Sequence, residues 1–154
     1  MSRAFVKEQD GEVIDDLPDR PVSEHPNFVT APGLALIEDA LAHAQSEYAK
    51  AQAENDRAAL ARSGRDLRYW TARRSSAQLI AAPNGADEVQ FGSTVTLARD
   101  DGRTQTWHIV GEDEADPAQG TISHVSPLAR ALFGKRVGDV VAAGQGEAEI
   151  TAIA

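Results

Sequence analysis

The chain has 154 residues, with 24 acidic and 15 basic side chains and a formal net charge of −9 at pH 7. No apolar run approaches the ~20 residues that a membrane-spanning helix requires, so we expect a cytoplasmic protein without a membrane segment. The chain has no cysteine, which excludes disulfides, thiolate nucleophiles and cysteine-ligated zinc.

The charge is unevenly distributed and divides the chain into three parts. Residues 1–30 carry seven acids and three bases. Residues 31–80 carry six acids and seven bases, and residues 81–154 carry eleven acids and five bases. The corresponding net charges are −4, +1 and −6, so only the middle part is not acidic. We therefore predict an N-terminal arm over 1–30, a second part over 31–80 and a C-terminal part over 81–154.

The N-terminal arm mixes acids with three prolines and shows no hydrophobic period. A segment of this composition buries too little apolar surface to offset the entropy of ordering it. The arm is therefore predicted to be extended or disordered, with Phe28 and Val29 among the residues that could still pack.

The middle part predicts an antiparallel helical hairpin. Thr30-Ala-Pro-Gly is typical of a helix start, with a threonine cap and a proline inside the first turn. Apolar residues then recur every three or four positions, at Leu34, Ile37, Leu41, Ala44, Tyr48 and Ala51. A second seam follows at Leu60, Leu67, Trp70 and Ala77, although Arg74 stands where an apolar residue would be expected.

The turn of this hairpin is predicted within "AENDRA". Asn55 and Asp56 have short polar side chains that bond to their own backbone in turns and at helix starts. A rival turn at Ser63-Gly64 would make the two helices very unequal, so Gly64 is interpreted as a helix glycine that costs ~1 kcal/mol. The hairpin tip is therefore expected at Glu54, Asn55 and Asp56.

The C-terminal part predicts an antiparallel sheet. Residues 89–99 and 103–110 read as strands around the tight turn Asp100-Asp101-Gly102, with Trp107 and Ile109 on one face. A last strand pair is expected from Val137, turning at residues 144–146.

A short helix is predicted within "SHVSPLARALFGKRVGDVV". Ser126 is the expected cap, Pro127 the first helical residue and Gly134 the left-handed stop, while Leu128, Ala131 and Leu132 form the buried stripe. One helix laid on an antiparallel sheet is the simplest packing of these elements, which gives an α+β fold class.

Several stretches resemble a known family. "FGSTVTLARDDG", "IVGEDEADPAQGTIS" and above all "SPLARALFGKRVGDVV" resemble the C-terminal domain of the bacterial GreA/GreB transcript cleavage factors. "NFVTAPGL" resembles the start of their first hairpin helix, and "RDLRYW" followed by "AQLI" resembles the end of the second, closer to the GreB branch. The resemblance implies an N-terminal antiparallel helical hairpin (coiled coil) followed by an FKBP-like antiparallel β-sheet domain with one short helix.

The resemblance also implies a partner and a role. In that family the C-terminal domain docks on core RNA polymerase, and the hairpin enters the secondary channel. Acids at the tip help to hold the second catalytic Mg²⁺, so that the polymerase cuts backtracked RNA itself. We therefore expect a monomeric accessory factor that meets nascent RNA only inside the elongation complex, has no active site of its own and needs no cofactor except the polymerase Mg²⁺.

The tip departs from the family pattern Asp-x-x-Glu-Asn-x-Asp/Glu-Tyr, of which only Glu54, Asn55 and Asp56 remain. Glu54 and Asp56 could offer two carboxylates to the shared Mg²⁺, but the same residues also suit plain turn chemistry. The helices are in addition several turns shorter than the family's, each turn being ~5.4 Å. We expect weak or no stimulation of cleavage, and a true cleavage factor using Glu54 and Asp56 is the alternative.

Arginines on the second hairpin helix are candidates for RNA or polymerase contact, because guanidinium groups bind phosphate through paired hydrogen bonds. The candidates are Arg57, Arg62, Arg65 and Arg68. The alternative is a solvated face that pairs with Glu38, Asp39 and Glu47 of the first helix. An acidic chain is in any case a poor independent binder of duplex DNA.

The short C-terminal helix and the residues after it are the candidate docking surface for polymerase. The residues are Ser126, Pro127, Leu128, Arg130, Lys135 and Arg136. The alternative is that this helix only closes the core. Another function left open is an interaction regulator resembling the Rnk protein, which is linked to control of nucleoside diphosphate kinase. FKBP-like prolyl isomerase activity has little support, because a shared fold does not carry a catalytic pocket.

Overall fold

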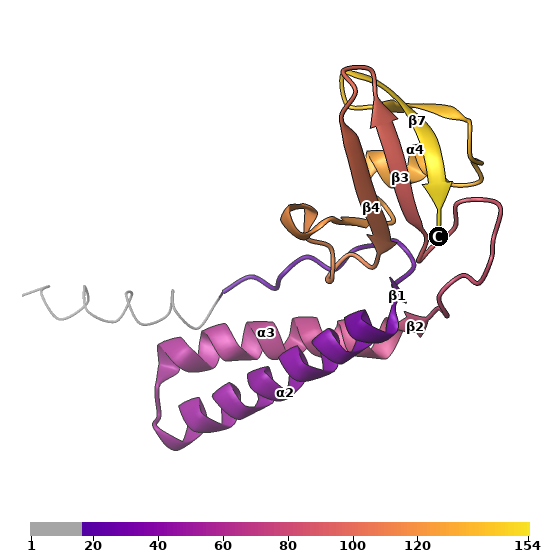
Figure 1. Cartoon of the computed structure of the whole chain (residues 1–154). Coiled ribbons are helices and arrows are strands. Elements are labelled where there is room, and N and C mark those ends of the chain that lie inside the picture. The colour runs from indigo at the N-terminus through magenta and orange to yellow at the C-terminus, as the bar shows by residue number, and fades with distance from the viewer. Residues whose placement is uncertain (1–16) are drawn as a thin grey trace, which may run out of the picture. The chain divides into compact units, whose positions relative to one another are not determined.

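The structure is a computed structural model that describes residues 17–154, so residues 1–16 of the predicted arm over 1–30 lie outside the described residues. Contacts group the described chain into two units. The hairpin unit contains residues 17–24 and 35–76, and the sheet unit contains residues 25–34 and 77–154. Figure 1 labels the helices of the hairpin unit and strands of the sheet unit.

The predicted hairpin is confirmed. Helix α2 spans Ala31–Ala53 and helix α3 spans Arg57–Ser76, and the two run side by side in opposite directions (Figure 1). The cap expected for the first helix is also present, because the Gly33 N–H donates a hydrogen bond of 3.0 Å to the Thr30 hydroxyl.

The seam between the helices differs from the prediction on α3. On α2 the buried hydrophobic residues are Ile37, Ala44 and Ala51, which belong to the expected period. On α3 they are Ser63, Gly64 and Arg73, whereas Leu60, Leu67 and Trp70 are only half-buried. A Cβ added at Gly64 would lie 3.5 Å from the Tyr48 ring, which is an ordinary van der Waals distance, so small residues line the seam at this point. Hydrophobic period alone missed this small-residue contact.

The sheet unit contains a five-stranded sheet in the order β5-β4-β3-β7-β6. The strands are β3 (Thr94–Arg99), β4 (Thr104–Val110), β5 (Thr121–Ser123), β6 (Val140–Ala143) and β7 (Gly146–Ile153), with the 3-10 helix η1 (Pro117–Gln119) before β5. Neighbouring strands are antiparallel except β4 and β5, which pair in parallel at one edge. The predicted first strand begins later than expected, at Thr94, and Val137 precedes β6 as an exposed residue.

A second, two-stranded sheet was not predicted from the sequence. Strand β1 (Phe28–Val29) pairs in parallel with β2 (Gln78–Leu79), which joins the segment before α2 to the segment after α3. Gly111 packs against this pair so closely that an added Cβ would lie 2.5 Å from the Phe28 carbonyl oxygen. Strands of two residues carry no period, so only the tertiary structure reveals them.

The core lies between the sheet and helix α4 (Pro127–Leu132), which covers one face of it (Figure 1). Leu97, Ile109, Leu132 and Ile150 are fully buried there. The predicted cap is confirmed, because the Ser126 hydroxyl accepts a hydrogen bond of 3.3 Å from the Ala129 N–H. Ala129 is fully buried, whereas Leu128 and Ala131 of the predicted stripe pack against the core only in part. Among residues 17–154, no helix is long and apolar enough to cross a bilayer.

Candidate functional site

The hairpin tip lies where the sequence predicted it. Helix α2 ends at Ala53, and Asn55 takes the left-handed conformation with φ 51°, which reverses the chain. The Asp56 carboxylate then accepts a hydrogen bond of 3.0 Å from the Ala59 N–H and so caps α3. Glu54, Asn55 and Asp56 are all exposed, and the structure brings them together at one turn.

The tip offers two carboxylates and no more. Within residues 17–154, no group of three or more His, Cys, Asp or Glu side chains is placed to hold a metal ion. Mg²⁺ requires near-octahedral oxygen coordination at ~2.1 Å, so Glu54 and Asp56 could only complete a site whose other ligands come from elsewhere. One oxygen of Asp56 is already engaged by the helix cap.

The candidate arginines lie on the outer face of α3. At ~100° per residue, Arg57, Arg62, Arg65 and Arg68 fall within an arc of about 140°. Arg57, Arg62 and Arg68 are exposed and Arg65 is half-buried. The Arg65 Nε atom is buried without a hydrogen-bond partner in the described chain. Arg74, further along the same helix, pairs with Glu38 of α2 at 3.0 Å, which is the kind of ion pair that the solvated-face alternative expects.

The arm crosses this face of α3. Arg68 donates a hydrogen bond of 2.6 Å to Asp19, and Arg20 pairs with Asp66 at 3.2 Å. The Arg20 guanidinium also lies 3.9 Å from the centroid of the Tyr69 ring. No pattern in the sequence indicates these contacts, since an aperiodic acidic segment predicts no docking position. Asp19, Arg20 and Tyr69 are thus the functional candidates that sequence reasoning missed.

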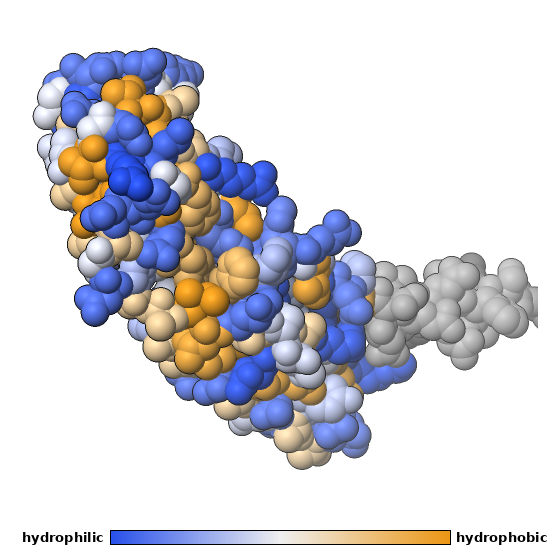
Figure 2. Space-filling view, turned by 90° about the vertical axis from the view of Figure 1, so that its right-hand side faces the viewer, coloured by the Kyte–Doolittle hydropathy of each residue, from blue (hydrophilic) through white to orange (hydrophobic). Residues whose placement is uncertain are grey.

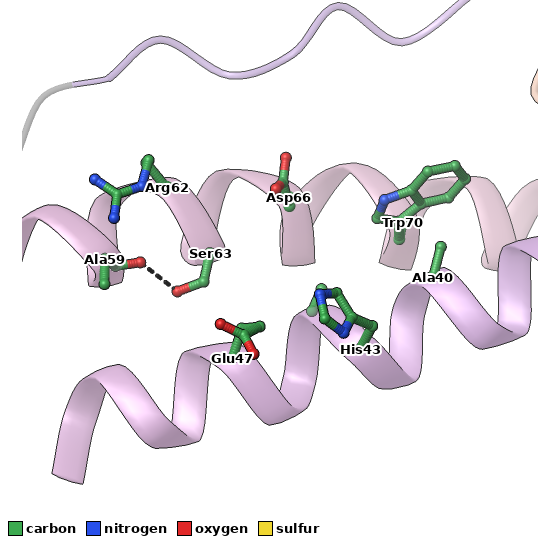
Figure 3. A pocket seen from close by; sticks show the side chains of 9 residues that line it. Ala40, His43, Glu47, Ala59, Arg62, Ser63, Asp66 and Trp70 are labelled. Carbon is green, nitrogen blue, oxygen red and sulfur yellow. Dashed lines mark hydrogen bonds between the residues drawn. The ribbon is translucent and has the colours of Figure 1, made fainter. Parts of the chain in front are cut away.

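A groove of about 310 Å³ opens between α2 and α3 (Figure 3). His43 and Glu47 line it from α2, and Arg62, Asp66 and Trp70 line it from α3. Its walls thus combine bases, carboxylates and one aromatic ring. The Ser63 hydroxyl in the groove donates a hydrogen bond of 2.6 Å to the Ala59 carbonyl of its own helix, so the hydroxyl hydrogen is already used within α3.

The candidate docking residues gather around α4. Pro127 and Arg130 are exposed, whereas Ser126 and Leu128 are half-buried. The Arg130 guanidinium lies 3.4 Å from the His25 ring nitrogen. The helix therefore closes the core through one side and presents polar groups on the other.

Lys135 and Arg136 follow α4 and are both exposed. Arg136 donates a hydrogen bond of 2.8 Å to Glu88, and this bond raises the pKa of the arginine above its ordinary value. The Glu88 carboxylate therefore partly balances the positive charge of Arg136. The nearby Val137 and Val140 are 58% and 56% exposed, which adds apolar surface beside these bases. Figure 2 shows hydrophobic residues in patches between hydrophilic ones on the face in view.

The chain matches known proteins along most of its length. The sequence model described as "Transcription elongation factor, GreA/GreB, C-term" matches residues 83–154. The transcription elongation factor GreA of Chloroflexus aggregans is 36% identical over 138 residues, which cover 75% of this chain and 87% of that protein. GreB of Neisseria meningitidis serogroup B is 50% identical over 80 residues, and this match spans 50% of this chain but only 48% of that protein.

A solved structure is also similar. The crystal structure of GreA factor homolog 1 of Thermus thermophilus overlays on 84% of this chain and 99% of its own, with 22% sequence identity and a TM-score of 0.40.

Proposed function

This chain belongs to the GreA/GreB family of transcription elongation factors. We propose that it binds bacterial core RNA polymerase and regulates elongation through the secondary channel. It does so as a monomeric accessory factor with weak or no stimulation of transcript cleavage. One observation carries the proposal: the similarity to GreA extends over three-quarters of the chain, more than the C-terminal domain alone supplies.

The two units have different roles in this proposal. The sheet unit docks through the surface around α4, where Arg130 and Lys135 are exposed beside the half-buried Leu128. Charged groups at the rim of an interface mainly set orientation and association rate, while the apolar contacts supply much of the affinity. The hairpin unit is the part that enters the channel, since its tip is polar and its helices are held together by their own seam.

Weak cleavage follows from the tip and the helix lengths. Helix α2 has 23 residues, which is about 34 Å at 1.5 Å per residue. A carboxylate acts on Mg²⁺ only in direct contact, so a tip that stops one turn short contributes nothing to the metal. Asp56 also caps α3, which ties its side chain to the turn. The shared Mg²⁺ of the polymerase is the only metal that the proposal involves.

The tip carboxylates can be tested without breaking the turn. We expect the variant Glu54→Gln with Asp56→Asn to leave cleavage of backtracked RNA unchanged, because on this proposal the tip carboxylates do not reach the metal. Asparagine still caps a helix, so this variant keeps α3 intact where Asp56→Ala would not. The measurement is the rate of RNA cutting and of elongation in a stalled complex made with core polymerase.

The matched control is Asp100→Asn with Glu149→Gln, which removes two exposed carboxylates from the sheet unit. Failure of the wild type to bind core polymerase or to change elongation would reject the proposal as a whole.

The alternative of a true cleavage factor rests on the exposure of Glu54 and Asp56 at one turn. It predicts strong cutting by the wild type and its loss in the Glu54→Gln, Asp56→Asn variant. The same assay therefore decides between the two, since the control variant should cut like the wild type under either.

A further inference from the structure

We propose that residues 17–20 of the arm are a built-in competitor for single-stranded RNA on the outer face of α3. The inference rests on the proposed function, because it concerns how access to the RNA-facing side of the hairpin is regulated. The contacts involved all lie within the hairpin unit.

The arm occupies the groups that a single strand would use. Single-strand binding sites combine arginines for the phosphates with aromatic rings on which bases stack. On α3 the arm contacts Arg68 and the edge-to-face pair of rings Tyr69 and Trp70, whose centroids are 5.0 Å apart. Arg65 is the group with a buried Nε that has no partner in the described chain.

The side chains of the arm imitate the two parts of a nucleotide. The Asp19 carboxylate accepts a hydrogen bond of 2.6 Å from Arg68, which is the position of a phosphate oxygen. The planar Arg20 guanidinium lies 3.9 Å from the Tyr69 centroid and 5.5 Å from the Trp70 centroid, which is the position of a stacked base.

The Asp66 carboxylate on α3 favours contact with a base over contact with a phosphate. Its carboxylate now pairs with Arg20 at 3.2 Å. When the arm leaves, this carboxylate repels phosphate but can accept hydrogen bonds from the amino or imino groups of a base edge. The face therefore suits an unpaired strand, whose base edges are free, better than a duplex.

The arm is held weakly enough to be displaced. The side chains of Arg68 and Asp19 are 56% and 67% exposed, and exposed ion pairs contribute little and are screened by salt. Leu17 adds an apolar contact, because it lines a cavity of about 220 Å³ together with Tyr48 and Leu60. A strand with several phosphates and bases would gain more contacts than these residues provide.

The preceding part of the arm is also acidic. Residues 1–16 contain five acids and two bases. RNA held beside the hairpin in an elongation complex would have a high effective concentration there, so it would compete with the arm more strongly than free RNA does.

The test uses a charge-neutral release of the arm in the full chain. We expect Asp19→Asn with Arg20→Gln to bind a short fluorescent oligouridine about three- to tenfold more tightly than the wild type at low salt, which is near the lower end of what two exposed ion pairs and one cation–π contact contribute. The matched control is Asp101→Asn with Arg103→Gln, which removes another exposed ion pair, in the β3–β4 turn. Equal affinity of the released variant and the wild type, including no binding by either, overturns the inference.

A second readout follows the arm itself. The chain has no cysteine, so a nitroxide at Val22→Cys reports the mobility of the arm alone; Val22 is 45% exposed. Oligouridine should make this label mobile in the otherwise wild-type chain, and the released variant should be mobile without RNA. RNA binding with no change in the label overturns the inference, and so does equal competition by a duplex DNA of the same length.

These outcomes are separable from those of the proposed function. Oligouridine binding and label mobility are measured without polymerase, whereas the proposed function is tested by polymerase binding and elongation. A chain that changes elongation but shows no arm effect keeps the proposed function and loses only this inference.

Discussion

Leu132→Ala is expected to lower the free energy of unfolding by about 2–5 kcal/mol, the largest effect of any truncation considered for the sheet unit. Leu132 is fully buried in the cluster that also contains Ile109, Val141 and Ile150. Removing its branched end leaves a cavity that the packed sheet cannot close. Chemical denaturation of the full chain, monitored by circular dichroism, measures the loss.

Leu128→Ala is the control for this prediction. Leu128 lies in the same helix but is only half-buried, so its truncation should cost clearly less stability. If α4 is the docking surface, Leu128→Ala should instead weaken polymerase binding out of proportion to its effect on unfolding. Equal unfolding losses for the two variants would contradict the packing of α4 described above.

Gly111→Ala is expected to destabilise the chain by about 2–3 kcal/mol. The added Cβ would lie 2.5 Å from the Phe28 carbonyl oxygen, and backbone cannot move aside as a flexible side chain can. Phe28 belongs to β1, directly before the cap Thr30 of α2. The substitution therefore strains the root of the first hairpin helix as well as the sheet unit.

Gly146→Ala provides a matched glycine control. The nearest atom to a Cβ added at Gly146 is the end of the Arg99 side chain, at 4.0 Å, so this alanine should be tolerated. Thermal unfolding of both variants measures the difference. An undisturbed Gly111→Ala protein would mean that β1 does not approach Gly111 as described.

The features that the sequence predicted well are those with local causes. The Asn55-Asp56 turn, the Ser126-Pro127 helix start and the tight turn at residues 100–102 depend on side chains that bond to nearby backbone. The two helices were predictable because their apolar residues recur at helical spacing. The tip residues of the candidate site were found for the same reason.

The features that escaped prediction depend on contacts between distant segments. The β1–β2 pair joins residues 50 positions apart, and each strand has only two residues. The parallel pairing of β5 depends on the path of the acidic loop before it, which carries no period. Likewise, the docking of Asp19 and Arg20 on α3 is set by single ion pairs, which leave no pattern in a sequence.

Crosslinking from the hairpin tip tests the central claim most directly. The chain lacks cysteine, so Ala53→Cys, at the exposed end of α2, takes a single short photoactivatable crosslinker. In a stalled elongation complex we predict crosslinks to polymerase segments that line the secondary channel near the active centre, whereas the same group at Ala142→Cys in β6 should react only at or outside the channel rim. A complex that forms normally, but in which the tip crosslinks only to the outer surface of the polymerase, would contradict the account.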